Sequence, residues 1–434
     1  MCATINLLPK VTKQKSNKNK QRTNDFINIK FKSMRKLLAI ILVLGLFTSC
    51  KKDLGGIEEP INVPLTTTLN GTYMETITLT ADKVWTLKGY VYITNGSRLI
   101  IQPGTTIVSD IAEKGALIIE RGAQIIAEGT PTKPIVFTSG KPEGQRAPGD
   151  WGGIVILGMA KTNRATEPTI EGGVGRAYGG TLDNDNSGVL RFVRIEYAGI
   201  AAMPNSEINA LTLGGVGSGT IIENVQTIYA NDDAFEFFGG TVSPKNLYAY
   251  ATADDDYDFD FGYTGTVTNG VAKRDPQFVD NGDAGNGVEC DNDGTGSTAQ
   301  PFTHPKLNGM ILIGPFDATA LSNHNLGLRW RRATQFTMTN SKILGYQKGG
   351  FSIESNETAQ AYKDGISKFQ NNEIQAYDPL LNFKSTSTLF TAAQMKEKAL
   401  GEGNVEKNYT KGEMESLSKP IWINGWTRFP TKGN

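Results

Sequence analysis

Histidine and cysteine are scarce in this chain. Its 434 residues include two histidines, His304 and His324, and three cysteines. Zinc centres are built from three or four such ligands at short spacings, and the sequence offers no such pattern. We expect Cys2 to precede the true start and Cys50 to carry lipid, which leaves Cys290 without a disulfide partner. Because so few bases are present, we interpret Cys290 as a small structural residue and not as a nucleophile.

The sequence also has no apolar run that is long enough to serve as a transmembrane anchor. The run at 37–47 has about eleven residues, whereas a membrane-spanning helix needs about 20. Its flanks match a bacterial lipoprotein signal, because two basic residues precede it and the small pair Thr48–Ser49 follows. Cys50 is then the predicted lipidated residue. The predicted leading segments are a mis-assigned leader over 1–33, with translation starting at Met34, and a signal peptide over 34–49.

An excess of basic charge is missing as well. The chain has 44 basic and 44 acidic side chains, but residues 1–50 hold ten of the basic and one of the acidic ones. The mature protein therefore keeps 34 basic and 43 acidic residues, a formal charge of −9. Nucleic acids and anionic membrane surfaces select clustered Lys and Arg, so neither is predicted as a partner. An acidic surplus suits cations or neutral ligands better. Phosphate-cradling loops and basic aromatic stripes are also absent.

Short repeats are what the sequence does contain. From about residue 85, alternating apolar residues are followed by a glycine turn, as in Leu99–Ile107 and Leu117–Ile125. Equivalent positions of these copies recur after about 26 residues. Stacked coils of this length predict an all-β fold, a right-handed parallel β-helix. Leucine-rich repeats would need helical segments and a Leu/Asn frame that are missing, and a β-sandwich remains an alternative.

The domain plan follows from this pattern. Long polar, glycine-rich breaks predict loops that project from the solenoid at 138–150, 172–188 and 267–305. A short helix is predicted at 391–400. The complete plan has a lipidated tether over 50–68, a β-helix domain over 69–385 and a C-terminal cap over 386–434.

Three segments carry a family resemblance. Gly149–Gly158, Pro134–Ser139 and Asp232–Gly240 resemble β-helical outer-membrane lipoproteins of the Bacteroidetes type. The resemblance implies a pectin-lyase-like β-helix held at the outer membrane by its lipid, in a group whose members mostly lack an assigned activity. Lys51–Asp53 is similar to the charged tags that direct lipoproteins to the outer leaflet, so display on the cell surface and a periplasmic orientation both stay open.

Acidic residues gather in two strand-like segments, 231–237 and 254–261. Pairing the phenylalanines at a spacing of 24 residues would stack Glu236 beneath Asp260 and Asp232 beneath Asp256. Stacked carboxylates about 4.8 Å apart repel one another unless a proton, an arginine or a cation compensates them. Continuing this register predicts one outward column, made of Glu236, Asp260, Glu289, Arg331 and Glu354.

Binding is the first interpretation of this column. Asp232, Glu236, Asp256 and Asp260, with Asp258, are candidate Ca²⁺ ligands, because Ca²⁺ prefers carboxylate oxygens. Alternatively, carboxylates could hold a glycan that stacks on an aromatic ring. The predicted ligand-binding residues are Tyr257, Asp258, Glu289, Trp330 and Glu354.

Catalysis is the second interpretation, as a polysaccharide lyase or glycoside hydrolase. Its candidate residues are Asp232, Glu236, Asp256, Asp260 and Arg331, because lyases use an arginine base and hydrolases use paired acids. No Gly-His-Gly or Arg-Ile-Lys motif of the polygalacturonase type is present. A purely structural ladder is the third interpretation. We favour a lipid-anchored binding or interaction module for a glycan, a cation or a partner outer-membrane protein such as a nutrient receptor.

Overall fold

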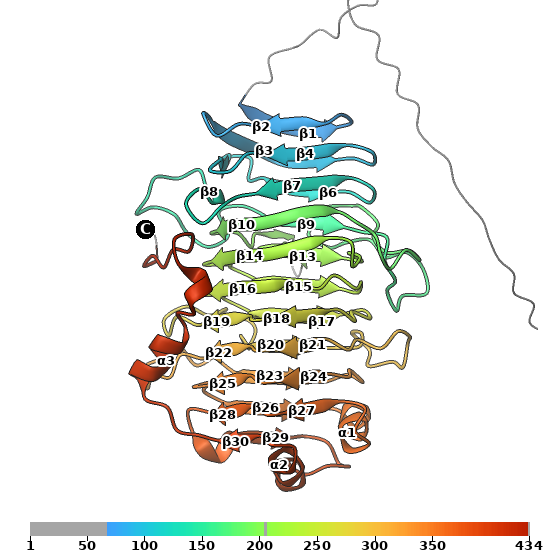
Figure 1. Ribbon diagram of the computed structural model, residues 1–434, viewed down its shortest axis with the longest axis vertical. Helices are drawn as coiled ribbons and strands as arrows, with labels where there is room; N and C mark the ends of the chain where they lie inside the picture. Colours follow the sequence, from blue (N-terminus) through green and yellow to red (C-terminus); the bar gives the residue numbers. More distant parts are fainter. Residues whose placement is uncertain (1–66, 204–205, 433–434) are drawn as a thin grey trace, which may run out of the picture. The chain divides into compact units, whose positions relative to one another are not determined.

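The computed structural model describes residues 67–203 and 206–432. Over these residues the chain winds into a right-handed parallel β-helix, and 28 of its strands belong to one continuous sheet (Figure 1). This confirms the predicted fold class. A separate antiparallel pair is formed by β11 (Ala201–Met203) and β12 (Ser206–Glu207). Within the described residues, no helix is both long and apolar enough to span a bilayer.

Strand pairing divides the solenoid into three faces, which we call A, B and C. Face A contains β5 (Thr106–Ser109), β8 (Ile135–Ser139), β16 (Lys245–Tyr250), β19 (Val271–Lys273), β22 (Ile311–Ile313), β25 (Lys342–Leu344), β28 (Glu373–Gln375) and β30 (Val405–Glu406). Face B contains β6 (Ala116–Ile119), β9 (Ile154–Leu157), β13 (Leu211–Gly214), β15 (Phe235–Phe238), β17 (Tyr257–Asp260), β20 (Val288–Cys290), β23 (Leu326–Trp330), β26 (Gly349–Ile353) and β29 (Phe383–Ser385).

Face C is the shortest of the three. It contains β2 (Ile77–Leu79), β4 (Arg98–Ile101), β7 (Gln124–Glu128), β18 (Thr266–Thr268), β21 (Lys306–Asn308), β24 (Thr337–Thr339) and β27 (Lys368–Gln370). Four longer strands bend across a corner and join two faces: β1 (Thr68–Tyr73), β3 (Val84–Ile93), β10 (Gly188–Glu196) and β14 (Ile221–Ile228).

The core is a stack of like residues. Alternate side chains of each strand point inward, so an aromatic residue in one coil lies on an aromatic residue in the next. Phe235 stacks on Tyr257 with ring centroids 5.4 Å apart, and Phe237 stacks on Phe259 at 4.8 Å. All four side chains are fully buried. Offset stacks of this kind add to the free energy gained from burial.

The predicted coil length of 26 residues is confirmed near the N-terminal end of the solenoid. Val91 pairs with Leu117, and Leu99 pairs with Ile125. The predicted loop at 267–305 is only partly correct, because it contains β19 and β20. Each of these strands has three residues, and the Gly- and Asp-rich segments around them hide their alternation.

One corner of the solenoid is built from asparagines in the left-handed region. Asn224, Asn246 and Asn269 have φ between 56° and 59°, and they occupy equivalent positions of successive coils. Asn246 donates to Asn224 over 3.1 Å, and Asn269 donates to Asn246 over 3.3 Å. Asparagine tolerates this backbone conformation better than other residues with a Cβ, so it allows the sharp turn between faces C and A.

Helices occur near the C-terminal end. They are α1 (Asn356–Lys363), α2 (Ala392–Gly401), α3 (Lys411–Leu417) and two 3₁₀ turns, η1 (Pro379–Leu381) and η2 (Ile421–Ile423). The predicted helix at 391–400 corresponds to α2. It begins with a capping box of Thr391 and Gln394 and adds buried Met395 to the end of the core.

Residues 405–430, which we call the C-terminal strap, leave this end again. In Figure 1 the red chain runs back along face A, from β30 past α3 to the side of β10. Tyr248 donates to the carbonyl of Ser418 over 3.0 Å, and Arg194 donates to the carbonyl of Trp426 over 2.9 Å. The strap therefore fastens coils that are not neighbours.

Candidate functional site

Face B places carboxylates in register on its outer side. In the β-ladders Glu236 pairs with Asp258, Asp258 with Glu289, and Glu289 with Arg329. The inward neighbours of these residues are the stacked aromatic side chains, so the strand alternation fixes the acids outside. Adjacent coils are about 4.8 Å apart, which brings each carboxylate close to the next one.

The turns before these strands add four further acids. Asp232 and Asp233 precede β15, and Asp254 and Asp255 precede β17. The Asp255 amide donates to the Asp233 carboxylate over 2.8 Å, which fixes one turn on the other. Three overlapping triads result, and within each triad one oxygen per residue lies within 4.8 Å of the others: Asp232, Asp233 and Asp254; Asp233, Glu236 and Asp258; Asp255, Asp258 and Glu289.

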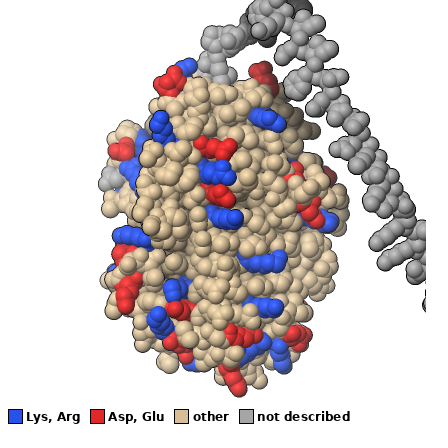
Figure 2. All heavy atoms as spheres, in the orientation of Figure 1, with Lys and Arg blue, Asp and Glu red and all other residues tan. Residues whose placement is uncertain are grey.

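We call these seven residues the acidic cluster. Loops outside face B cover it, and Asn209 donates from its side-chain amide to the Glu236 carboxylate. Glu236 is only 6% exposed. A cavity of about 470 Å³ opens beside the first triad, and its lining includes five carboxylates but no Lys or Arg: Glu207, Asn231, Asp232, Asp254, Asp280, Gly282 and Asp283. By contrast, the face of the molecule drawn in Figure 2 shows basic and acidic side chains interspersed.

The charges of the cluster are poorly compensated. Among the described residues, Glu289 is the one member with an ion pair to Lys or Arg. Burial, followed by repulsion from neighbouring carboxylates, raises the pKa values of Asp233, Glu236 and Asp258 well above their ordinary range. Burial also raises the pKa of Glu289, to about 8. The fully buried Oδ1 of Asp258 has no hydrogen-bond partner in the described chain.

Arginines close one end of the cluster. Arg329 donates to Glu289 over 2.8 Å and to Glu354 over 3.1 Å. Arg331 pairs with Glu289 and, over 2.9 Å, with Asp291. The guanidinium groups thus act as fixed cations at this end. The two triads that contain Asp233 have no such partner.

The predicted register of the acidic segments was wrong by two residues. The true spacing is 22, so Glu236 lies against Asp258 and not against Asp260. Phe261 is not an inward residue; it lies beyond β17 with φ of 49°, and it stacks on Phe238. A shift by two residues keeps every side chain on its face, so alternation alone could not reveal the error.

Two predicted calcium ligands consequently lie outside the triads. Asp256 is fully buried and pairs with Arg274, whose Nη1 lies 3.2 Å from the Asp256 carboxylate. Asp260 accepts a hydrogen bond from the amide of Phe261 over 2.6 Å. Asp232 and Glu236 do belong to the cluster. The predicted single column was therefore a mixture of two adjacent columns.

The predicted stacking platform for a sugar was also wrong. Tyr257 and Trp330 point into the solenoid and are fully buried. Tyr257 donates to the carbonyls of Leu247 and Val271, and Trp330 stacks on Phe336 at 4.4 Å. Each follows the inward alternation of its strand, which the analysis of charge patterns had overlooked.

The sequence-based prediction missed Asp233, Asp254 and Asp255 as cluster members. Each belongs to a run of consecutive acids, Asp232–Asp233 or Asp254–Asp256. Such runs lie in turns, where the alternation of strand residues no longer decides which side chain points outward. The density of acids in these runs was the available signal. Cys50, the predicted lipidation site, lies outside the described residues.

Comparison with known proteins agrees with this architecture. A family model described as a pectate-lyase-like β-helix domain matches residues 71–427, so the chain belongs to this family. No curated protein and no solved structure matches the chain.

The raised pKa of Glu289 makes the stability of the cation-free protein depend on pH. Folding moves this pKa from 4.5 to about 8, so the folded state holds a proton that the unfolded state releases. The stabilising contribution is complete below pH 4.5 and is lost as the pH rises toward 8. We therefore expect urea unfolding in EDTA to give a falling free energy of unfolding over this window.

The variant Glu289→Gln serves as the control for this measurement. It keeps the shape of the side chain but cannot ionise, so its free energy of unfolding should fall less steeply with pH. A wild-type stability that rises or stays flat between pH 4.5 and 8 in EDTA would contradict the electrostatic account.

Proposed function

We propose that this member of the pectate-lyase-like β-helix family is a lipid-anchored protein of the cell envelope whose acidic cluster binds Ca²⁺. The observation that carries this proposal is the buried, unpartnered Oδ1 of Asp258, which belongs to a carboxylate shared by two of the three triads. A buried polar atom without a partner costs free energy, and a bound cation would remove that cost.

Calcium fits the chemistry of the cluster. Ca²⁺ takes six to eight oxygen ligands in flexible geometries, at about 2.3–2.6 Å. Asp233, Glu236 and Asp258 supply carboxylate oxygens from two adjacent coils, and Asn209 adds an amide next to Glu236. The acidic cavity beside Asp232 gives ions a route to this position from solvent. Mg²⁺ demands stricter octahedral geometry, which a row of overlapping triads is less suited to provide.

Binding agrees with the contacts better than catalysis does. A lyase would need a free arginine near the acids, but Arg331 is paired with Glu289 and Asp291. Burial and these carboxylates together leave the Arg331 pKa raised, so the group stays protonated. Asp232 lines the acidic cavity, whereas Arg331 is held at the opposite end of the cluster. We therefore propose a binding module and advance no reaction.

The anchor rests on the sequence. The apolar run at 37–47 and Cys50 form a lipoprotein signal, and the solenoid begins less than 20 residues after Cys50. A short lipidated tether would keep the β-helix within reach of the outer membrane. A partner membrane protein and the side of the membrane that the domain faces stay predictions.

Calcium binding is tested by thermal unfolding at pH 7.5. Ca²⁺ should raise the melting temperature of the wild-type protein over its value in EDTA, by about 2.7 kcal/mol of stability at a concentration 100-fold above Kd. Asp258→Asn should be more stable than wild type in EDTA, because it removes a buried charge, and should gain much less from Ca²⁺. Asp364→Asn, which alters an exposed aspartate, should match wild type in both conditions.

The calcium proposal fails if Ca²⁺ leaves the wild-type melting temperature unchanged. It also fails if Asp258→Asn and Asp364→Asn gain equally from the ion.

Lipidation is tested by expression in a bacterial host with an alkyne-labelled fatty acid. We expect the wild-type chain to take up the label and to appear in the outer-membrane fraction. Cys50→Ser should lose the label and become soluble, whereas Cys290→Ala should behave as wild type, because Cys290 is buried in the core. Label that persists in Cys50→Ser would show that the anchor is not at this residue.

A further inference from the structure

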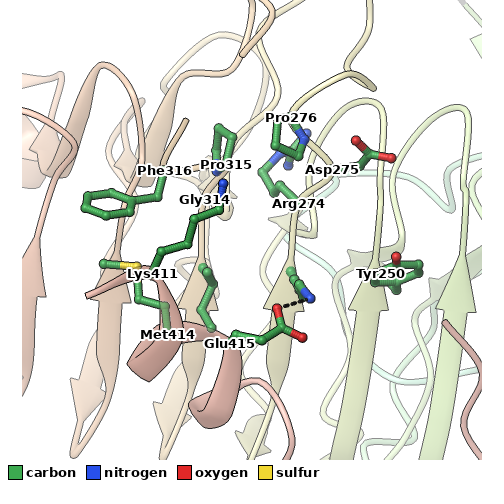
Figure 3. A pocket seen from close by; sticks show the side chains of 12 residues that line it. Tyr250, Arg274, Asp275, Pro276, Gly314, Pro315, Phe316, Lys411, Met414 and Glu415 are labelled. Carbon is green, nitrogen blue, oxygen red and sulfur yellow. Dashed lines mark hydrogen bonds and ion pairs between the residues drawn. The ribbon is translucent and has the colours of Figure 1, made fainter. Parts of the chain in front are cut away.

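A second cavity lies where the C-terminal strap crosses face A. Its volume is about 300 Å³, at the lower end of the range that small-molecule sites occupy. One wall comes from the ends of β16, β19 and β22, and the other comes from α3 (Figure 3). The residues that the argument below uses are Tyr250, Lys273, Asp275, Phe316, Lys411 and Glu415.

The strap wall of this cavity is a fixed part of the fold. Met414 of α3 is 2% exposed and packs against Ile313 and Leu344 of face A. Farther along the strap, the side-chain amide of Gln226 makes two hydrogen bonds to the backbone of Arg428, of 2.7 and 2.9 Å. The cavity is therefore formed before any ligand arrives, which lowers the cost of binding.

The charges around the cavity exclude an anionic ligand. Lys273 is paired with Glu415, and Lys411 is paired with Asp317 over 2.9 Å. Asp275 accepts from the hydroxyl of Tyr229 over 2.9 Å. Both lysines are thus already neutralised, so an anion would have to break an ion pair to bind. The same groups offer ammonium donors and carboxylate acceptors close together, which suits hydroxyl groups that both donate and accept.

The apolar part of the lining consists of rigid rings. In Figure 3, Tyr250 and Phe316 stand on opposite sides of the labelled group. Tyr250 is held by an edge contact with Phe429 at 5.2 Å, and Phe316 by one with Tyr377 at 5.8 Å. Preformed aromatic walls next to matched donors and acceptors are complementary to a sugar ring, which has C–H faces and a hydroxyl edge.

We propose that this cavity binds an uncharged sugar unit of a glycan. The inference gives the proposed binding module a ligand class, but it depends on residues of face A and the strap and not on calcium. It also replaces the buried Tyr257 and Trp330 as the place where a glycan would stack.

The test is saturation-transfer NMR on the wild-type protein in EDTA. The probes are a panel of neutral gluco-, manno- and galacto-oligosaccharides, together with oligogalacturonate as the anionic comparison. We expect at least one neutral sugar to bind and oligogalacturonate not to compete with it. Phe316→Leu removes one ring and Lys411→Met removes one donor, and each should weaken binding about tenfold or more.

Lys407→Met is the matched control, because it alters a strap lysine that pairs with Glu373 and does not line the cavity. It should bind the sugar as wild type does, and the melting temperatures of all variants should confirm that they fold. Absence of binding across the neutral panel, preference for oligogalacturonate, or equal binding by Phe316→Leu and Lys411→Met would each overturn the inference. Because EDTA is present throughout, these outcomes leave the calcium proposal to its own experiment.

Discussion

The stacking of coils about 4.8 Å apart is the constraint on which this structure depends. It places each residue directly over its counterpart in the next coil, so the consequence differs between the two sides of a strand. Inside, Phe237 over Phe259 gives a favourable stack. Outside, Glu236 over Asp258 gives two carboxylates in a covered position. The same geometry that builds the core therefore creates an electrostatic problem on face B.

The protein solves this problem at one end of the acidic cluster only. Arg329 and Arg331 neutralise Glu289, and Arg274 separately neutralises Asp256 in the interior. The triads that contain Asp233 receive no Lys or Arg within the described chain. Retaining buried charges without partners is costly, so a fold that keeps several of them is explained most simply by an ion that pairs with all of them. Function is in this sense grafted onto a general scaffold.

Much of the fold could be predicted from the sequence, because glycine turns and alternating apolar residues repeat at the coil length. Val91 over Leu117 was predictable from spacing alone. The acidic segments resisted prediction for a physical reason: registers of 22 and 24 residues leave the same side chains outside, and only the position of Phe261 beyond β17 distinguishes them. Turn residues such as Asp233 and Asp255, and the path of the strap, depend on contacts between distant coils that no local pattern encodes.

The most direct measurement of the central claim is an anomalous difference map from crystals of the protein soaked in Tb³⁺ or Ca²⁺. The account predicts a peak at ligand distance, about 2.3–2.6 Å for Ca²⁺, from Asp258 Oδ1 and from Asp233 or Glu236. A fully ordered cluster without a peak, with its carboxylates sharing protons or water instead, would contradict it.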